Sequence, residues 1–297
     1  MHTKKIKEIL SRAKREISSL DAEILLEMAT GISREKLFSN PEKTLSDKVS
    51  ENFFNLVEKR KNTPLAYLSQ KKEFFTREFF VNKNVLIPRP ETEILVEEVI
   101  KDFTGGSILE VGTGSGVIST TLKLEIPNLG IAASDISGKA LRVAKKNAKN
   151  LEAEVVFFKS NLLSFFRPTL SFASFLSFAT SPVAFLFNLV RNRKMEYNFE
   201  IIVANLPYVI SREITGQIKE EPKIALDGGL DGFDLYRRLF KEIAGNLKKL
   251  NTKKIFCEID PRQKNILSME VEKYFPGAKV KFTKDLSGKI RVAKIFL

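Results

Sequence analysis

The tetrapeptide Asn205-Leu206-Pro207-Tyr208 directly follows the apolar, β-branched run Glu200–Ala204, which is typical of a buried strand. Its residue types suit the activation of an amino group conjugated to a carbonyl or an aromatic ring, a poor nucleophile because its lone pair is delocalised. The Asn205 side-chain oxygen and the Leu206 carbonyl can each accept one N–H bond of such a group, which draws the nitrogen toward tetrahedral geometry. Pro207 stiffens that carbonyl, and Tyr208 can pack on the flat face of the group. A strand-terminating turn is the plainer alternative.

A glycine-rich loop lies between the predicted strand Ser107–Val111 and a predicted helix. It reads Gly112-Thr113-Gly114-Ser115-Gly116, and its glycines let the backbone pass close to a ligand and point N–H groups at it. The pattern alone is weak, because many dinucleotide-binding folds use it. Glu110, just before the loop, favours S-adenosylmethionine (SAM), since a carboxylate there can hold the methionine ammonium but gains nothing beside a pyrophosphate. A surface glutamate at a strand end is the alternative.

Polar residues also end the next two predicted strands. Asp135 can accept both ribose hydroxyls of an adenosine, which serves NAD and SAM equally. Asn161 is placed to accept from an adenine amino group and Leu162 to cover the ring, although an ordinary turn asparagine is the alternative. Together these residues predict a nucleoside site.

The composition limits the chemistry that the chain can perform. The 297 residues include 49 Lys and Arg against 36 Asp and Glu, a net charge of +13 that suits either a polyanionic partner or a lysine-rich surface. The single histidine, His2, excludes a Ser/His/Asp triad and a histidine-rich metal site, and we expect no metal. Cys257 is the only cysteine, so the chain forms no internal disulfide, which fits a reducing compartment, and the N-terminus has no apolar signal core. We expect a cytoplasmic protein.

The elements that must position these residues alternate between strand and helix from Ile94 onward. Strands are predicted at Ser107–Val111, Gly130–Ser134, Glu154–Phe158, Glu200–Ala204, Lys254–Glu258, Val280–Thr283 and Arg291–Phe296. Alternation of this kind predicts an α/β fold with a mostly parallel sheet, in which ligands bind at the carboxyl ends of the strands.

The first third of the chain reads as a small helical bundle. Apolar residues recur at helical spacing, one helix is predicted to end at Gly31, and another runs from Ser46 to Lys61. Residues 73–90 suggest a β-hairpin with a turn near Asn82–Asn84. We therefore predict a helical domain at 1–72, a hairpin linker at 73–90 and a larger α/β domain at 91–297.

A Phe- and Ser-rich stretch at about 165–195 interrupts this pattern. It has no charge from Pro168 to Val190, a length close to the ~20 residues that span a bilayer. Because it lies between two core strands, we favour an apolar insertion packed on the catalytic domain, ahead of contact with a membrane surface or partner, and ahead of a membrane span.

Several further segments match a known pattern. They are Asp21–Leu26, Thr63–Leu68, Leu86–Glu93, Glu221–Gly229, Asp231-Gly232, Tyr236-Arg237, Glu258–Asp260 with Gln263, and Asp285–Val292. With these segments the chain resembles, over nearly its whole length, the HemK/PrmC family, SAM-dependent methyltransferases of a glutamine amide in peptide chain release factors. Leu86–Glu93, which reads LIPRPETE, is the most specific match.

The resemblance implies a Rossmann-like class I SAM-dependent methyltransferase domain with a seven-stranded sheet, joined by a β-hairpin to a small helical domain. It implies that Asn205 to Tyr208 bind and activate the glutamine of the GGQ motif, with Arg89 and Glu91 also in substrate binding. Gly112 to Gly116 and Asp135 would bind SAM, Pro88 to Glu93 would pack near it, and the helical domain would recognise the substrate. Glu110, Asn161, Leu162 and Asn205 are the further SAM contacts that we expect. The expected partners are class I release factors, with no obligatory nucleic acid and with the enzyme a monomer.

Three features depart from the family pattern. The usual tetrapeptide is N-P-P-Y where this chain has Leu206, the usual Asp is Asn161 here, and the Phe- and Ser-rich stretch is longer than the usual link. Because the Asn-x-Pro-Tyr grip suits planar amines in general, methylation of adenine or guanine, or of a ribosomal-protein glutamine, is the alternative function. An inactive SAM-binding interaction module is the third.

Overall fold

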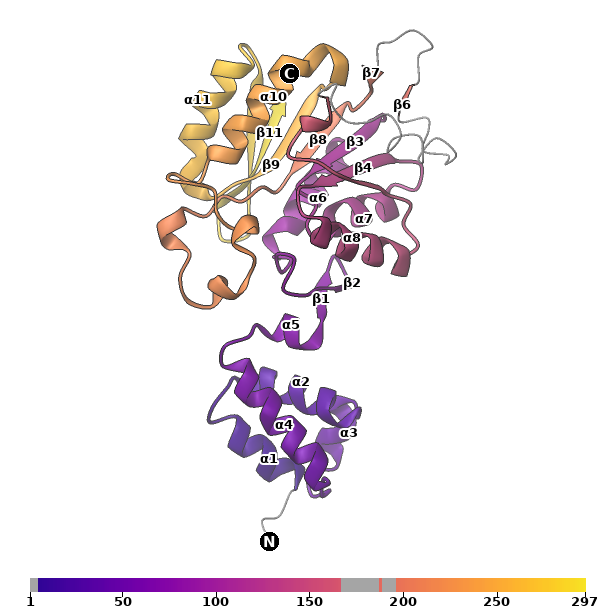
Figure 1. Cartoon of the computed structure of the whole chain (residues 1–297), viewed down its shortest axis with the longest axis vertical. Helices are drawn as coiled ribbons and strands as arrows, with labels where there is room; N and C mark the ends of the chain where they lie inside the picture. The colour runs from indigo at the N-terminus through magenta and orange to yellow at the C-terminus, as the bar shows by residue number, and fades with distance from the viewer. Residues whose placement is uncertain (1–4, 167–186, 189–195) are drawn as a thin grey trace. The chain divides into compact units, whose positions relative to one another are not determined.

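The computed structural model describes residues 5–166, 187–188 and 196–297. It divides into two compact units, Met1–Lys71 and Lys72–Leu297. Figure 1 follows the chain through both units in colour.

Helices make up the first unit. They are α1 (Ile6–Ala13), α2 (Ser19–Thr30), α3 (Arg34–Ser39), α4 (Asp47–Arg60) and α5 (Leu65–Ser69). The side-chain oxygens of Ser18 and Ser46 accept main-chain N–H bonds at the starts of α2 and α4, and Gly31 ends α2 in the left-handed conformation. The apolar residues at helical spacing meet in one buried cluster that includes Leu25, Leu26 and Phe53. The predicted helical bundle is confirmed.

A two-stranded hairpin, β1 (Lys71–Phe74) and β2 (Arg77–Phe80), begins the rest of the chain. Its turn is formed by Phe75 and Thr76, both at positive φ, so the predicted turn at Asn82–Asn84 is wrong for the hairpin. Glycine or asparagine usually occupies such positions. Here the Phe75 N–H donates to the Glu93 carboxylate at 2.8 Å, a contact with helix α6 that the local sequence does not reveal. Asn82–Asn84 instead forms a separate turn after β2, in which Asn82 Oδ1 accepts from the Asn84 N–H.

The second unit is built on a seven-stranded sheet of order β10-β11-β9-β8-β3-β4-β5. The five strands from β9 to β5 are parallel, and β11 pairs antiparallel with both β9 and β10. The strands are β3 (Ser107–Val111), β4 (Gly130–Asp135), β5 (Val156–Lys159), β8 (Ile201–Ala204), β9 (Lys254–Glu258), β10 (Lys279–Lys284) and β11 (Ile290–Phe296). The predicted α/β fold with a mostly parallel sheet is confirmed.

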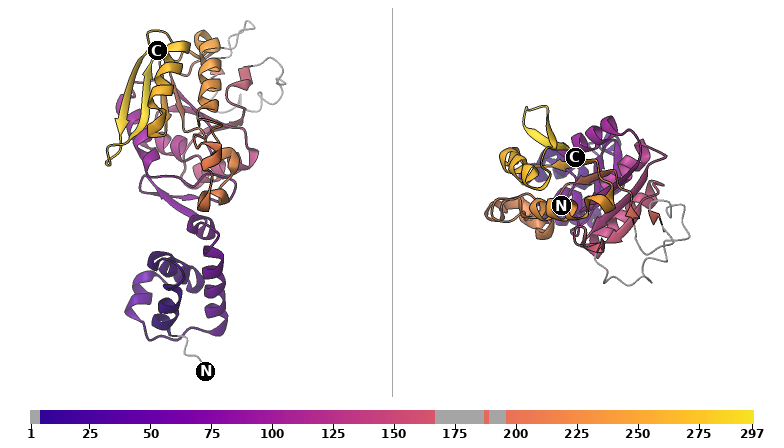
Figure 2. Two further views of the ribbon diagram at one scale, coloured as in Figure 1. Left: turned by 90° about the vertical axis from the view of Figure 1, so that its left-hand side faces the viewer. Right: turned by 90° about the horizontal axis from the view of Figure 1, so that it is seen from above.

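Helices cover both faces of this sheet because its central strands are apolar on both sides. Along β8, Ile201 and Val203 point to one buried cluster and Ile202 and Ala204 to the other. Helices α6 (Glu91–Asp102), α7 (Val117–Glu125) and α8 (Gly138–Asn150) lie on one side, and α10 (Asp234–Leu250) and α11 (Lys264–Tyr274) on the other. Figure 2 shows the same separation by colour, with the orange and yellow helices apart from the purple and magenta ones.

The predicted insertion at about 165–195 falls almost wholly outside the described residues, so its packing and any membrane contact stay predictions. Two short strands at its end, β6 (Phe187–Asn188) and β7 (Glu196–Tyr197), pair antiparallel. Within the described ranges, no helix is both long and apolar enough to cross a membrane.

A buried asparagine on α8 connects three parts of the second unit. The Asn147 side chain accepts from the Phe80 N–H at 2.7 Å and donates to the carbonyls of Phe80 and Ser115 at 2.9 and 2.8 Å. It is 1% exposed. Asn147 therefore continues the hydrogen bonding of β2 and holds the end of the glycine loop against α8.

Replacing Asn147 with alanine should destabilise the fold. The change leaves main-chain groups of Phe80 and Ser115 without their partner, which costs about 1–3 kcal/mol of unfolding free energy. Urea unfolding followed by circular dichroism measures it. Asn150→Ala, at an exposed position on the same helix, is the control and should stay within about 0.5 kcal/mol of the parent. Equal stability of the two variants would contradict the role of Asn147.

Candidate active site

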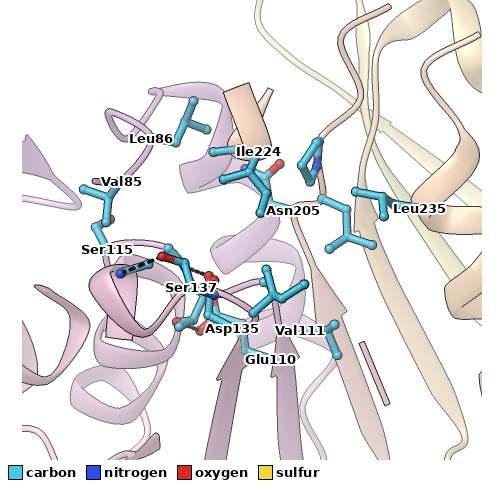
Figure 3. A pocket seen from close by; sticks show the side chains of 18 of the residues that line it. Val85, Leu86, Glu110, Val111, Ser115, Asp135, Ser137, Asn205, Ile224 and Leu235 are labelled. Atoms are coloured by element: carbon cyan, nitrogen blue, oxygen red, sulfur yellow. Dashed lines mark hydrogen bonds between the residues drawn. The ribbon is translucent and has the colours of Figure 1, made fainter. Parts of the chain in front are cut away.

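A cavity of about 560 Å³ opens at the carboxyl ends of β3, β4, β5 and β8. This is the edge at which parallel α/β sheets bind ligands. In Figure 3, Asn205 lies across the cavity from Asp135 and Ser137. The predicted site residues that line it are Arg89, Glu110, Gly112, Thr113, Gly114, Ser115, Asp135, Asn161, Leu162, Asn205, Leu206 and Pro207. Gly116, Tyr208 and Glu91 do not line it.

Glu110 is a buried carboxylate, so the alternative of a surface glutamate is wrong. It is 1% exposed, and its Oε2 accepts from the Thr113 hydroxyl at 2.6 Å and the Ser119 N–H at 3.1 Å. Its Oε1 is also buried but has no hydrogen-bond partner among the described residues. Burial raises the pKa of Glu110 to about 7, against the opposing effect of these hydrogen bonds. A cationic ligand group would satisfy the unpartnered oxygen and favour the ionised form.

The glycine loop turns between β3 and α7 because two of its residues cannot carry side chains. At Gly112 (φ +81°) a Cβ atom would lie 2.9 Å from Leu206 Cδ2, and at Gly116 (φ +79°) it would lie 2.9 Å from the Ala144 Cβ. The first glycine thus lets the loop pack against the tetrapeptide, and the second lets α7 approach α8. Gly116 packs against Ala144 and is the N-cap of α7, and it does not line the cavity.

Asp135 connects the glycine loop to the start of α8. Its Oδ2 accepts from the Gly114 N–H at 2.8 Å, and its Oδ1 accepts from the Ser137 N–H at 2.7 Å. A carboxylate offers about four acceptor positions, so lone pairs remain for ligand hydroxyls. Burial raises the pKa of Asp135, while the two N–H groups oppose that shift.

The residues after β5 border the same cavity. Leu162 is buried, whereas Asn161 is exposed, and its Oδ1 already accepts from Arg238 Nη2 at 3.1 Å. Any adenine amino group would therefore share this oxygen with Arg238. Adenine binding by Asn161 stays a prediction.

A buried carboxylate determines how Asn205 is oriented. Asn205 Nδ2 donates to Glu258 Oε2 at 3.0 Å and to Thr92 Oγ1 at 3.2 Å. Glu258 is 1% exposed, and burial raises its pKa, although hydrogen bonds from Thr92 and Tyr208 oppose the shift. In its ionised form the Glu258 carboxylate only accepts hydrogen bonds, and the amide nitrogen of Asn205 then faces it. The Asn205 oxygen is then the end of the amide available to a ligand.

The rest of the tetrapeptide is held by its own contacts. The Tyr208 hydroxyl donates to Glu258 Oε1 at 3.0 Å, and burial together with the Glu258 charge raises the pKa of Tyr208. The phenol therefore stays protonated and keeps this bond. The Leu206 side chain is buried against Gly112, while Pro207 lines the cavity. Tyr208 does not line the cavity, and its packing on a substrate stays a prediction.

The two residues predicted from the LIPRPETE segment have other partners. Arg89 forms an ion pair with the buried Glu221, which also accepts from the Ile87 N–H at 2.9 Å. This pair fixes one wall of the cavity. Glu91 lies 3.5 Å from Arg291 Nη2. Substrate binding by Arg89 and Glu91 stays a prediction.

Sequence reasoning named no individual role for several residues of this site. Thr92, Glu258 and Arg238 contact predicted site residues, and Ile224 and Leu235 line the cavity. Thr92 lies in the Pro88–Glu93 segment that the resemblance places near the cofactor, and Glu258 ends a buried strand at the same edge as Glu110 and Asp135. Among the described residues, no three His, Cys, Asp or Glu side chains are grouped to hold a metal ion.

Known proteins resemble both parts of the chain. The family description "PrmC N-terminal domain" matches residues 3–69, and "Methyltransferase small domain" matches residues 90–171. The release factor glutamine methyltransferase of Bacillus cereus is 34% identical over 281 residues, which cover 91% of this chain and 89% of the relative. The protein of the same name from Leptospira interrogans is 35% identical and covers 97% of this chain and 94% of the relative.

The chain belongs to the release factor glutamine methyltransferase family. A solved structure, the hMettl16 catalytic domain in complex with MAT2A 3′UTR hairpin 1, has a TM-score of 0.50 and 13% identity, and covers 86% of this chain and 83% of that one. This likeness shows the fold alone. The enzyme class expected from the sequence is confirmed.

Replacing Glu258 with glutamine should slow methyl transfer in this member of the release factor glutamine methyltransferase family. Glutamine presents an N–H₂ group where the carboxylate presents an acceptor, so either Asn205 Nδ2 or the Tyr208 hydroxyl would face a donor. We expect kcat to fall on the order of 10- to 100-fold, with SAM affinity little changed.

Steady-state kinetics and titration calorimetry measure the two quantities. Glu272→Gln, at an exposed position on α11, is the control and should leave both unchanged. A normal kcat in Glu258→Gln would contradict this role for the carboxylate.

Proposed function

We propose that this chain transfers a methyl group from SAM to the side-chain amide nitrogen of the glutamine in the GGQ motif of class I peptide chain release factors. Membership of the family supports this proposal. The orientation of Asn205 carries it, because Glu258 and Thr92 occupy Nδ2 and leave Oδ1 for a substrate N–H group. We place the protein in the cytoplasm, where release factors act.

The cavity fits SAM. Glu110 supplies an unpartnered buried oxygen for the methionine ammonium, and Asp135 keeps acceptor positions for ribose hydroxyls. The Gly114 N–H already donates to Asp135. The loop therefore contributes mainly by letting its backbone pass close to SAM, and less by offering this N–H as a donor. When bound, SAM supplies an electrophilic methyl group. We propose that Glu110, the loop and Asp135 hold it, with Leu162 and Asn161 beside the base.

The residues of the tetrapeptide would activate the substrate amide by orienting it. Asn205 Oδ1 accepts one N–H of the glutamine side chain, and the Leu206 carbonyl accepts the other. Holding both bonds opposes conjugation of the nitrogen lone pair with the amide carbonyl, which leaves that pair free to bond to the methyl group as the nitrogen gives up one N–H proton.

Asn205→Ala should abolish most of this activity. Removing one of two acceptors that orient the amide lowers kcat on the order of 100-fold. The assay follows label from SAM into a release factor and locates it on the GGQ glutamine by mass spectrometry. Asn265→Ala, at an exposed position on α11, is the matched control and should retain full transfer.

The same assay includes undermodified RNA, DNA and ribosomal protein as acceptors. Label on any of these in place of the release factor would overturn the proposed substrate. Binding of SAM without transfer to any acceptor would instead support the inactive module.

SAM affinity should depend on the ionisation of Glu110. With the pKa of Glu110 raised to about 7, the free carboxyl is largely protonated below pH 7 and must lose its proton to hold an ammonium group. The dissociation constant should therefore rise about tenfold for each pH unit below 7 and level off above it. Calorimetry between pH 5.5 and 8.5 measures this dependence.

Glu110→Gln controls for the titration of SAM itself. It should bind SAM more weakly and should lose the part of the pH dependence that Glu110 contributes. Identical pH profiles for the parent and Glu110→Gln would show that Glu110 does not hold the ammonium group.

A further inference from the structure

A tyrosine outside the cavity makes contact with the tetrapeptide at its main chain. The Tyr236 hydroxyl accepts from the Leu206 N–H at 3.2 Å. Its own proton is directed to the carbonyls of Glu258 at 2.6 Å and Ala204 at 3.1 Å. One hydroxyl thus joins the carboxyl ends of β8 and β9 at the point where the tetrapeptide begins.

The Tyr236 ring is held rigidly in the core. It is fully buried near the start of α10, with its centroid 5.3 Å from that of Phe233 and 6.1 Å from that of Phe240. Burial holds the pKa of Tyr236 well above its ordinary value, so the hydroxyl keeps its proton and can donate while it accepts. A rigid ring fixes the position of the oxygen that meets the Leu206 N–H.

The Leu206 carbonyl lies between two fixed points of the main chain. On one side is the Leu206 N–H, held by Tyr236. On the other, the Tyr208 carbonyl accepts from Gln263 Nε2 at 3.2 Å. Pro207, between them, has a restricted φ and no N–H. The carbonyl direction is therefore set by contacts on both sides.

We propose that Tyr236 is a positioning residue for methyl transfer, because its hydroxyl, through the Leu206 N–H, holds the Leu206 carbonyl where it accepts the substrate amide. This proposal rests on the proposed function. The family pattern includes Tyr236 but has proline in place of Leu206, so the contact with the Leu206 N–H is absent where that position is proline. Proline restricts the backbone by its ring, whereas leucine offers an N–H that Tyr236 can hold.

A double-mutant cycle tests this assignment. Tyr236→Phe removes only the hydroxyl, Leu206→Pro removes the N–H that it holds, and Leu206→Ala keeps the N–H while shortening the side chain. Tyr236→Phe is made in the parent, in Leu206→Pro and in Leu206→Ala. The kcat, the KM for release factor and the dissociation constant of SAM are measured for all six proteins.

We expect Tyr236→Phe to lower kcat on the order of tenfold in the parent and in Leu206→Ala, the effect of losing the hydrogen bond that holds the Leu206 N–H. In Leu206→Pro the same change should alter kcat by less than about twofold, because the N–H is already absent. SAM affinity should be equal within each pair. An equal loss in all three backgrounds would assign Tyr236 a merely structural role and overturn the proposal, as would an unchanged kcat in the parent.

Two further readouts keep the test decisive. If Leu206→Pro does not fold, hydrogen exchange of the Leu206 amide is followed by NMR, and it should be faster in Tyr236→Phe than in the parent. Unchanged exchange would overturn the proposal. Absence of transfer to release factor by the parent protein itself would instead count against the proposed function, and amide exchange would still report on the Tyr236 contact.

Discussion

The site depends on one buried carboxylate at the end of β9. Glu258 accepts hydrogen bonds from both Asn205 and Tyr208, so a single side chain orients the first and last residues of the tetrapeptide. Burying a carboxylate costs free energy unless hydrogen-bond donors surround it. Here the donors are the Asn205 amide and the Tyr208 hydroxyl, the two groups whose orientation the site depends on. The cost of burying Glu258 is therefore offset by the bonds that give the Asn205 amide one orientation. With the opposite orientation, Asn205 would present a donor where the substrate amide also presents donors.

The same edge of the sheet carries two more acids, the buried Glu110 and the half-buried Asp135, and they differ in how many of their oxygens have hydrogen-bond partners. Both Asp135 oxygens accept main-chain N–H bonds, whereas one oxygen of Glu110 is without a partner among the described residues. Burial raises the pKa of Glu110, Asp135 and Glu258 alike. The three acids differ accordingly: Glu258 holds Asn205 and Tyr208, Asp135 holds the glycine loop, and Glu110 keeps one unpartnered oxygen, which we propose accepts the ammonium group of SAM.

Much of the fold could be predicted because its signals are local. The apolar run that becomes β8 and the Gly112–Gly116 loop require only neighbouring residues to be recognised. The hairpin turn was missed because Phe75 and Thr76 adopt positive φ where a remote carboxylate, Glu93, accepts the Phe75 N–H. Asn147 likewise looked like an ordinary helical residue, although its partners lie 67 and 32 residues away.

The sequence by itself determined which polar groups follow which strands along the chain. An acid ends the first of these strands, before the glycine loop, another acid ends the next strand, and an asparagine amide with a leucine carbonyl follows a later strand. Residue types and their spacing are sufficient for this inference. A buried parallel strand is apolar, and ligands bind at the carboxyl ends of such strands, so a polar residue directly after an apolar run indicates a binding residue. Only the tertiary structure decided which end of the Asn205 amide faces a ligand and what holds the Leu206 carbonyl. Thr92, Glu258 and Tyr236 make these contacts across 113, 53 and 30 residues, and such distances close only when the sheet has formed.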